Sequence, residues 1–173
     1  MNEPRSTLIP PSTVRFERLL PGPLERVWAY LTESEKRATW LAGGEWELRL
    51  GGRIEMHVDN ARLTDDPPPP APGACGKKVV EGRITRFEPL RALGHTWNWE
   101  GGQTEVLYEL APKGKDVLLT IHHRLPDDRD LKVGVSSGWV LHTGILLDLL
   151  NGVKPRPFHA TQQRLKKEYE AAL

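Results

Sequence analysis

The chain has 173 residues, 38% of them hydrophobic and 27% charged, which is typical of one soluble globular domain. Lys plus Arg total 24 and Asp plus Glu total 23, and the resulting net charge of +1 argues against nucleic-acid binding and against a polybasic membrane anchor. The single cysteine, Cys75, excludes an internal disulfide and a cysteine-based zinc site.

The same features predict a cytoplasmic protein. A lone cysteine fits a reducing compartment, and residues 1–14 lack the continuous apolar core of a signal peptide. The longest apolar run, residues 140–150, is interrupted by polar side chains and is too short to cross a bilayer. We therefore expect no membrane insertion.

The first part of the chain predicts a strand followed by two short helices. Residues 1–12 are expected to be a flexible N-terminus, and residues 13–20 alternate as in an edge-type strand. A Pro-Gly-Pro sequence ends that strand. One apolar helical face then follows at spacings i, i+3, i+4 and i+7, made by Leu24, Val27, Trp28 and Leu31. A second short helix is expected to run to about Trp40.

The middle of the chain predicts six strands. Residues 46–50 and 54–58 alternate around the pair Gly51-Gly52, a strong hairpin pattern. The Pro-rich residues 61–76 cannot pair in a sheet and should form an extended, exposed loop. Four further strands are expected at about residues 78–87, 93–99, 104–110 and 117–125.

The last part of the chain predicts a long helix and a shorter one. Residues 133–151 have a helical apolar pattern in which Asp148 is the only charge, so this helix must be covered on most sides. Beyond it, Phe158, Leu165 and Tyr169 share one face of an amphipathic segment. We expect a domain at residues 13–152 and a helical C-terminal tail at residues 153–173 that packs on it.

This order of elements predicts an α+β fold. A curved antiparallel sheet should wrap around the long C-terminal helix, with two short helices after the first strand. There is no strand–helix–strand alternation, which argues against a parallel, doubly wound sheet.

Several short motifs, in this order, resemble the family named after the C-terminal domain of the activator of the heat-shock-protein-90 ATPase. That family belongs to the START-like, or SRPBCC, superfamily with its helix-grip fold. The motifs lie at residues 16–31 (a strand, then Pro-x-x-x-Val-Trp), 49–53 (Arg-Leu-Gly-Gly-Arg), 82–89, 96–97, 119–123 and 138–139. The resemblance implies a deep cavity between sheet and long helix, which relatives use to bind lipids, hormones or polyketides, or to perform chemistry.

Strand alternation and the helical stripe together predict the lining of this cavity. An aromatic set with a few polar tips is typical of small-molecule pockets, although the same side chains could simply fill the core. The candidate ligand-binding residues are Trp40, Met56, His95, Trp97, Trp99, Tyr108, Ile121, His123, Trp139, His142 and Leu146.

Three of these residues are histidines, and they carry the chemical alternatives. His95, His123 and His142 could together bind zinc, but no close-spaced ligand pair or acidic partner supports this, so we expect no metal and no cofactor. One of them acting as a general base is a further alternative. Ser136 and Ser137 are expected to start the long helix and have no assigned base, and we assign no catalytic residue.

Three functions follow as hypotheses. The first is non-enzymatic binding of an apolar or aromatic small molecule that enters near the Pro-rich loop. The second is an enzyme of cyclase or hydrolase type that uses a pocket histidine. The third is a stress-related, co-chaperone-like interaction module, with a chaperone or a second copy of the chain as its partner.

Overall fold

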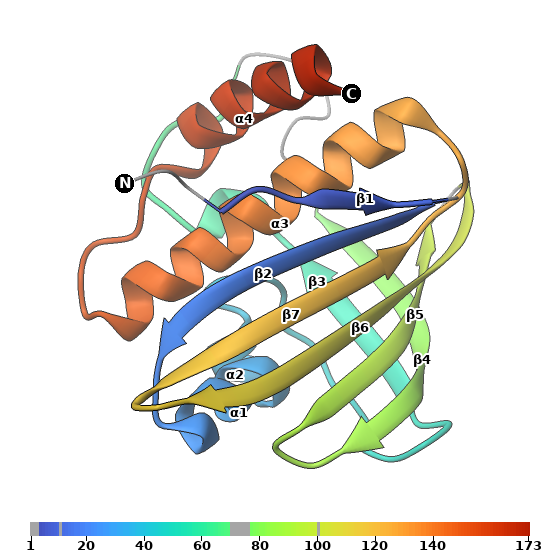
Figure 1. The fold of residues 1–173 in the computed structure, drawn as a ribbon, viewed down its shortest axis with the longest axis vertical. Coiled ribbons are helices and arrows are strands. Elements are labelled where there is room, and N and C mark those ends of the chain that lie inside the picture. The colour runs from blue at the N-terminus through green and yellow to red at the C-terminus, as the bar shows by residue number, and fades with distance from the viewer. Residues whose placement is uncertain (1–3, 11, 70–76, 100) are drawn as a thin grey trace.

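The computed structural model describes residues 4–10, 12–69, 77–99 and 101–173 (Figure 1). The strands are β1 (Thr7–Ile9), β2 (Thr13–Pro21), β3 (Arg53–Val58), β4 (Lys78–Glu88), β5 (Ala92–Trp99), β6 (Gly102–Lys113) and β7 (Asp116–Arg124). The helices are α1 (Leu24–Thr32), α2 (Ser34–Arg37), the 3₁₀ helix η1 (Asn60–Arg62), α3 (Arg129–Leu150) and α4 (Phe158–Ala172).

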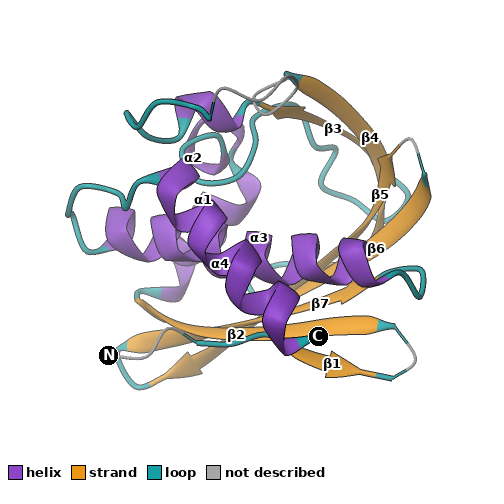
Figure 2. Ribbon diagram, turned by 90° about the horizontal axis from the view of Figure 1, so that it is seen from above, coloured by secondary structure: helices purple, strands orange, loops and turns teal. Residues whose placement is uncertain are grey.

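Within the described residues, all seven strands form one antiparallel sheet in the order β1-β2-β7-β6-β5-β4-β3. Side chains alternate between buried and less buried positions along β2 and β7, as expected for strands with one face on the core. The sheet curves, and the helices lie inside the curve (Figure 2). The predicted α+β fold is confirmed.

Helix α3 lies between the sheet and α4, and a buried arginine joins it to the sheet (Figures 1 and 2). The Arg18 side chain of β2 donates to the Thr143 hydroxyl at 2.9 Å and to the Val140 carbonyl at 3.0 Å. By length and composition α3 could cross a membrane, but most of its most apolar stretch is buried inside this fold. It is therefore the core helix of a soluble domain.

The start of α3 differs from the prediction. Asp128 caps the helix by accepting a hydrogen bond from the Leu131 backbone N–H at 2.7 Å, so the helix begins at Arg129 and not near residue 133. The motif Gly138-Trp139 consequently lies inside the helix and does not open it.

The predicted strand at residues 46–50 does not form. Trp46 makes only an isolated bridge to Ile54, and Arg49 N–H bonds the Glu47 carbonyl in a tight turn. The pair Gly51-Gly52 exchanges backbone hydrogen bonds with Ile84 of β4, which takes it out of a two-residue hairpin. Strand β1 was not predicted; it pairs with β2 from within the segment expected to be flexible.

Helix α4 is held by a side chain from the Pro-rich region. Asp66 accepts hydrogen bonds from the backbone N–H groups of Phe158, His159 and Ala160, the orphan donors of the first turn of α4. Burial raises the pKa of Asp66, but hydrogen bonds from the Thr64 hydroxyl and from these three N–H groups outweigh it, so the pKa is lowered. The loop is thus attached to the fold here, while residues 70–76, Cys75 among them, lie outside the described residues. The predicted apolar face of the tail is confirmed, since Phe158, Leu165 and Tyr169 are buried.

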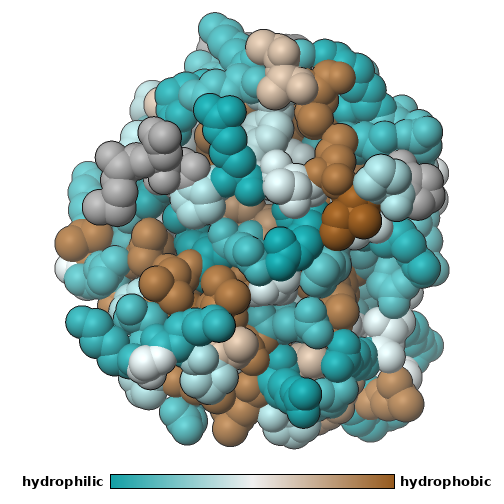
Figure 3. Space-filling view, viewed as in Figure 1, coloured by the Kyte–Doolittle hydropathy of each residue, from teal (hydrophilic) through white to brown (hydrophobic). Residues whose placement is uncertain are grey.

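The surface facing the viewer in Figure 1 mixes hydrophilic and hydrophobic side chains. Figure 3 shows small hydrophobic groups separated by hydrophilic residues. Large apolar side chains that are exposed, such as Leu19, Leu50 and Val79, lie on different elements of the chain. Such scattered exposure is ordinary for a soluble domain.

A fully buried cation, Arg37, organises the segment between α2 and β3. Its guanidinium donates to four backbone carbonyls and lies 3.8 Å from the centre of the Trp46 ring; the acceptors belong to Leu31, Thr32, Ala42 and Gly44. Burial lowers the pKa of Arg37 to about 10, so the side chain stays charged at neutral pH. It fixes the loop that carries Trp40 and Leu41 against the core.

We predict that Arg37→Met lowers the free energy of unfolding by about 2–4 kcal/mol, because it leaves several buried carbonyls without a donor. Arg37→Lys should cost less, since it keeps the charge but not the planar fork of donors. Urea unfolding measures both. The exposed Arg164→Met serves as control and should change stability by less than about 0.5 kcal/mol. Equal losses for Arg37→Met and Arg164→Met would contradict this role.

Candidate ligand-binding site

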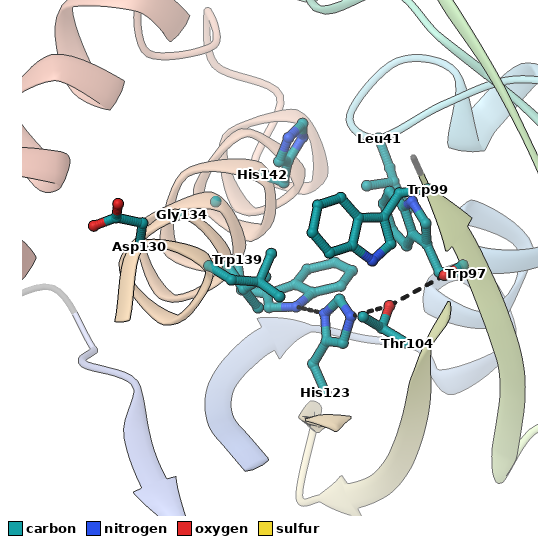
Figure 4. Close-up of a pocket in the computed structure, with 12 residues that line it drawn as sticks. Leu41, Trp97, Trp99, Thr104, His123, Asp130, Gly134, Trp139 and His142 are labelled. Atoms are coloured by element: carbon teal, nitrogen blue, oxygen red, sulfur yellow. Dashed lines mark hydrogen bonds between the residues drawn. The ribbon is translucent and has the colours of Figure 1, made fainter. Parts of the chain in front are cut away.

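A cavity of about 330 Å³ lies between the N-terminal half of α3 and strands β5, β6 and β7 (Figure 4). Indole rings and aliphatic side chains supply most of its wall, and Asp130 is the only charged residue among those described around it. It is lined by Leu41, Trp97, Trp99, Thr104, His123, Asp130, Leu131, Gly134, Val135, Gly138, Trp139 and His142. Its size is at the lower end of the roughly 300–1,000 Å³ typical of ligand pockets.

Two glycines keep the helical wall of the cavity open. A Cβ atom added to Gly134 or to Gly138 would meet no atom within 4 Å, so packing does not require glycine at either position. Gly144 on the same helix is different, because a Cβ there would lie 2.6 Å from the Arg156 guanidinium. A glycine inside a helix costs about 0.5–1 kcal/mol relative to alanine. At positions 134 and 138 no packing contact offsets this loss of helix stability, and the glycines only leave space beside the helix.

The polar groups of the cavity wall bond one another. Trp139 Nε1–H donates to His123 Nδ1 at 3.1 Å, so His123 carries its proton on Nε2 and donates it to the Thr104 hydroxyl at 2.9 Å (Figure 4). That hydroxyl in turn donates to the Trp97 carbonyl at 3.3 Å. Each hydrogen bond in this series has a defined donor and acceptor, and both ring nitrogens of His123 are hydrogen-bonded.

A second pair lies deeper, behind the cavity. His95 Nδ1–H donates to the Thr96 carbonyl at 2.9 Å, which leaves Nε2 to accept from the Tyr108 hydroxyl at 3.2 Å. The Tyr108 ring meets the Trp139 ring edge-on, with centroids 5.7 Å apart. This pair is therefore a satisfied part of the core that supports the indole wall from behind.

His142 differs from the other two histidines. Its Nδ1–H donates to the Trp40 carbonyl at 2.7 Å, and its ring packs on Phe158 with centroids 5.4 Å apart. Its Nε2 has no hydrogen-bond partner among the described residues and, with the proton on Nδ1, is an acceptor. His142 thus holds the segment after α2 against α3 and, as one of the residues that line the cavity, keeps one unused lone pair.

Burial keeps all three histidines neutral near pH 7. It lowers the pKa of His123 to about 3 and that of His95 to about 4, and it lowers the pKa of His142 as well. Burial also raises the pKa of Tyr108 well above its ordinary value. The residues that the structure describes contain no group of three metal-ligating side chains. The wall suits contact with an apolar molecule better than proton transfer or metal binding.

The structure divides the predicted site residues into two groups. Five of them line the cavity, with Trp99 at its mouth and 43% exposed: Trp97, Trp99, His123, Trp139 and His142. The other six lie in the surrounding core: Trp40, Met56, His95, Tyr108, Ile121 and Leu146. The remaining lining residues were not predicted from the sequence. The i, i+4 spacing of Gly134 and Gly138 in an otherwise apolar helix is the signal that could have found part of that wall.

The fold and this cavity define a helix-grip protein of the SRPBCC type. The sequence profile described as activator of Hsp90 ATPase homolog 1-like protein matches residues 21–151, so the chain belongs to that family. The resemblance stated from the motifs is confirmed. Among curated proteins, none matches the chain in sequence.

Solved structures support the same fold. The protein encoded by gene BPP1335 of Bordetella parapertussis is 37% identical, with a TM-score of 0.81 over 100% of this chain and 93% of that one. CalU16 of Micromonospora echinospora is 22% identical, with a TM-score of 0.70 over 97% and 94%. A conserved protein of unknown function from Enterococcus faecalis, EF2215, is 17% identical, with a TM-score of 0.66 over 99% and 92%. The last two similarities establish the fold alone.

We predict that buried histidines make the domain less stable in acid. An unfolded histidine has a pKa of about 6.5, above the folded value, so the unfolded chain binds more protons as the pH falls below about 6.5 and stability drops. His123→Gln keeps an acceptor and a donor but does not titrate. Between about pH 5.5 and 4 its stability should therefore fall less steeply than that of the parent protein, by about 1.4 kcal/mol per pH unit. Urea unfolding at several pH values measures the two slopes, and equal slopes would contradict a neutral, buried His123.

Proposed function

We propose that this protein binds a small apolar or aromatic molecule in the cavity beside α3, without transforming it. The observation that carries this proposal is the open space at Gly134 and Gly138. A domain selected only for stability would gain from alanine at both positions, because alanine favours the helix, and at the half-buried Gly138 its methyl group would also fill empty volume. Glycine at position 138 is therefore explained by a molecule that occupies this space.

The lining indicates the kind of molecule. Trp97 and Trp139 pack against each other edge to face, with ring centroids 6.4 Å apart, and together form an aromatic wall on which a planar ring can lie. The wall polar groups of His123 and Thr104 are already paired, so a ligand gains little from hydrogen bonds at that point. The ligand's own polar groups must therefore lie at the ends of the cavity and not against its strand wall.

An enzymatic alternative depends on His142. Its unused Nε2 lone pair at the cavity edge is the one feature among the described histidines that suits a general base. Burial lowers its pKa, so the ring is neutral and able to accept a proton near pH 7. If turnover of a bound molecule is found, His142→Gln should abolish it, and turnover that survives this change would remove the alternative.

We predict that the uncharged probe N-phenyl-1-naphthylamine binds the cavity, with a rise in its own fluorescence and quenching of the tryptophans. Gly138→Ala should raise the free energy of unfolding by about 0.5–1 kcal/mol and weaken probe binding, because its methyl group enters the cavity. Gly138→Leu should fill more of the volume and weaken binding by about tenfold or more.

Ala171→Leu is the matched control, since it adds bulk to an exposed position of α4 and should leave probe binding unchanged. Failure of the parent protein to bind the probe, or unchanged binding by a folded Gly138→Leu variant, would refute the proposed function.

A further inference from the structure

The cavity adjoins a second hollow that has a different chemical character. This basic groove, of about 340 Å³, lies between the loop after α2 and the start of β4 and is lined in part by Asp59, Arg62, Lys77 and Lys78. Leu41 lines both the cavity and the basic groove, and no other residue in the described part of the chain lines both. This one aliphatic side chain, 3% exposed, therefore borders both hollows.

The mouth of the cavity leads to the same cations by another route. Trp99 lines the cavity and also a shallow surface hollow that includes Lys78 and Val79. The basic groove shares both of these residues with that hollow. Lys78 thus lines both of the hollows that share a wall residue with the cavity, which is Leu41 in one and Trp99 in the other.

The charges in the basic groove leave positive charge unbalanced. Asp59 lies 3.7 Å from the Arg62 guanidinium and 3.8 Å from the Lys77 ammonium, so one carboxylate faces two cations. Lys78 has no carboxylate within ion-pair distance among the described residues. His57 lines the groove too, but its ring bonds Glu55 at 2.6 Å. Three cations against one facing anion make this a place for a negatively charged group.

The opposite end of the cavity has no excess of cations. Asp130 stands at the α3 side, where its almost fully exposed carboxylate lies 3.9 Å from the Arg129 guanidinium, and no described cation lines the cavity. An anionic group at that end would meet a carboxylate paired with one cation, whereas at the basic groove it would face more cations than carboxylates. A charged ligand would therefore be oriented by the protein before any specific contact forms.

We propose that the ligand is an anionic amphiphile: a compact apolar ring system that fills the cavity, joined to a carboxylate, sulfonate or phosphate that passes Leu41 or Trp99 and lies against Lys78 and Arg62. This inference rests on the proposed function and adds the chemical class of the ligand. The groove cations are positioning groups that fix which end of the ligand is buried.

Two probes with the same ring system test this proposal. N-phenyl-1-naphthylamine is uncharged, and 8-anilinonaphthalene-1-sulfonate differs from it by one sulfonate. In the double variant Arg62→Gln/Lys78→Gln, affinity for the sulfonate should fall by about threefold to tenfold, while affinity for the uncharged probe stays within about twofold. Raising the salt concentration from about 20 mM to about 300 mM should weaken the binding of the sulfonate probe and leave that of the uncharged probe unchanged. Lys113→Gln, on the distant β6–β7 hairpin, is the control and should change neither affinity.

The outcomes separate the two proposals. If the uncharged probe binds and the double variant binds the sulfonate probe as tightly as the parent protein does, the proposal of an anionic ligand is refuted and the proposed function stands. If the double variant, still folded by circular dichroism, loses both probes equally, the cations act on the cavity's shape and the anionic class is again refuted. If neither probe binds the parent protein, the proposed function fails and this inference fails with it.

Discussion

The structure depends on the need to cover one nearly uncharged helix. Between Asp130 and Asp148, α3 carries a single charge, Lys132, so an exposed α3 would place a long apolar surface in water. The curved sheet, the segment from α1 to Leu41 and helix α4 each cover one side of it, and β2 is fastened to it through Arg18. Most side chains in the C-terminal half of α3 are buried. Over the N-terminal half the side chains of Gly134 and Gly138 are missing, and the uncovered space is the cavity. Fold and candidate site are thus two results of the same packing problem.

The buried polar groups serve that packing in a consistent way. His95, His123 and His142 each make a directed hydrogen bond that fixes the ring, and burial keeps each ring neutral. Neutral rings cost far less to bury than imidazolium ions, and their bonds set the orientation of the indole and phenol groups beside them. Arg37 is the costly exception, a buried cation satisfied by carbonyls and an indole face. It holds the loop on which Leu41 stands, so this unusual burial positions the wall between the cavity and the basic groove.

The sequence predicted the sheet and the long helix because both depend on local periodicity, which packing followed here. It failed where tertiary bonds competed with local pattern. Residues 46–50 alternate correctly, yet Gly51 and Gly52 pair with Ile84 of β4 instead of closing a hairpin. Alternation predicts which face of a strand a side chain lies on, but not how deeply that side chain is buried. On β5, His95 and Trp99 share a face, yet His95 is fully buried and Trp99 is 43% exposed. Pocket and core residues could not be separated for that reason. Glycine usually indicates a turn, so the space that Gly134 and Gly138 leave beside α3 was not predicted from the sequence.

Membership in the Hsp90 ATPase activator-like family establishes the fold but not a ligand, because binding depends on the side chains of the site. A cavity with an apolar wall alone would accept many ring compounds, since dispersion and burial hardly distinguish among them. Selectivity requires charged or polar groups that are not already satisfied by the protein. In the described part of this chain, such groups are the Nε2 atom of His142 and the basic groove beyond Leu41, where Lys78 has no carboxylate partner and Asp59 alone faces both Arg62 and Lys77. Because the His123 and Thr104 groups of the cavity wall are neutral and bonded to each other, the proposed binding function would have to discriminate among ligands through these remaining groups.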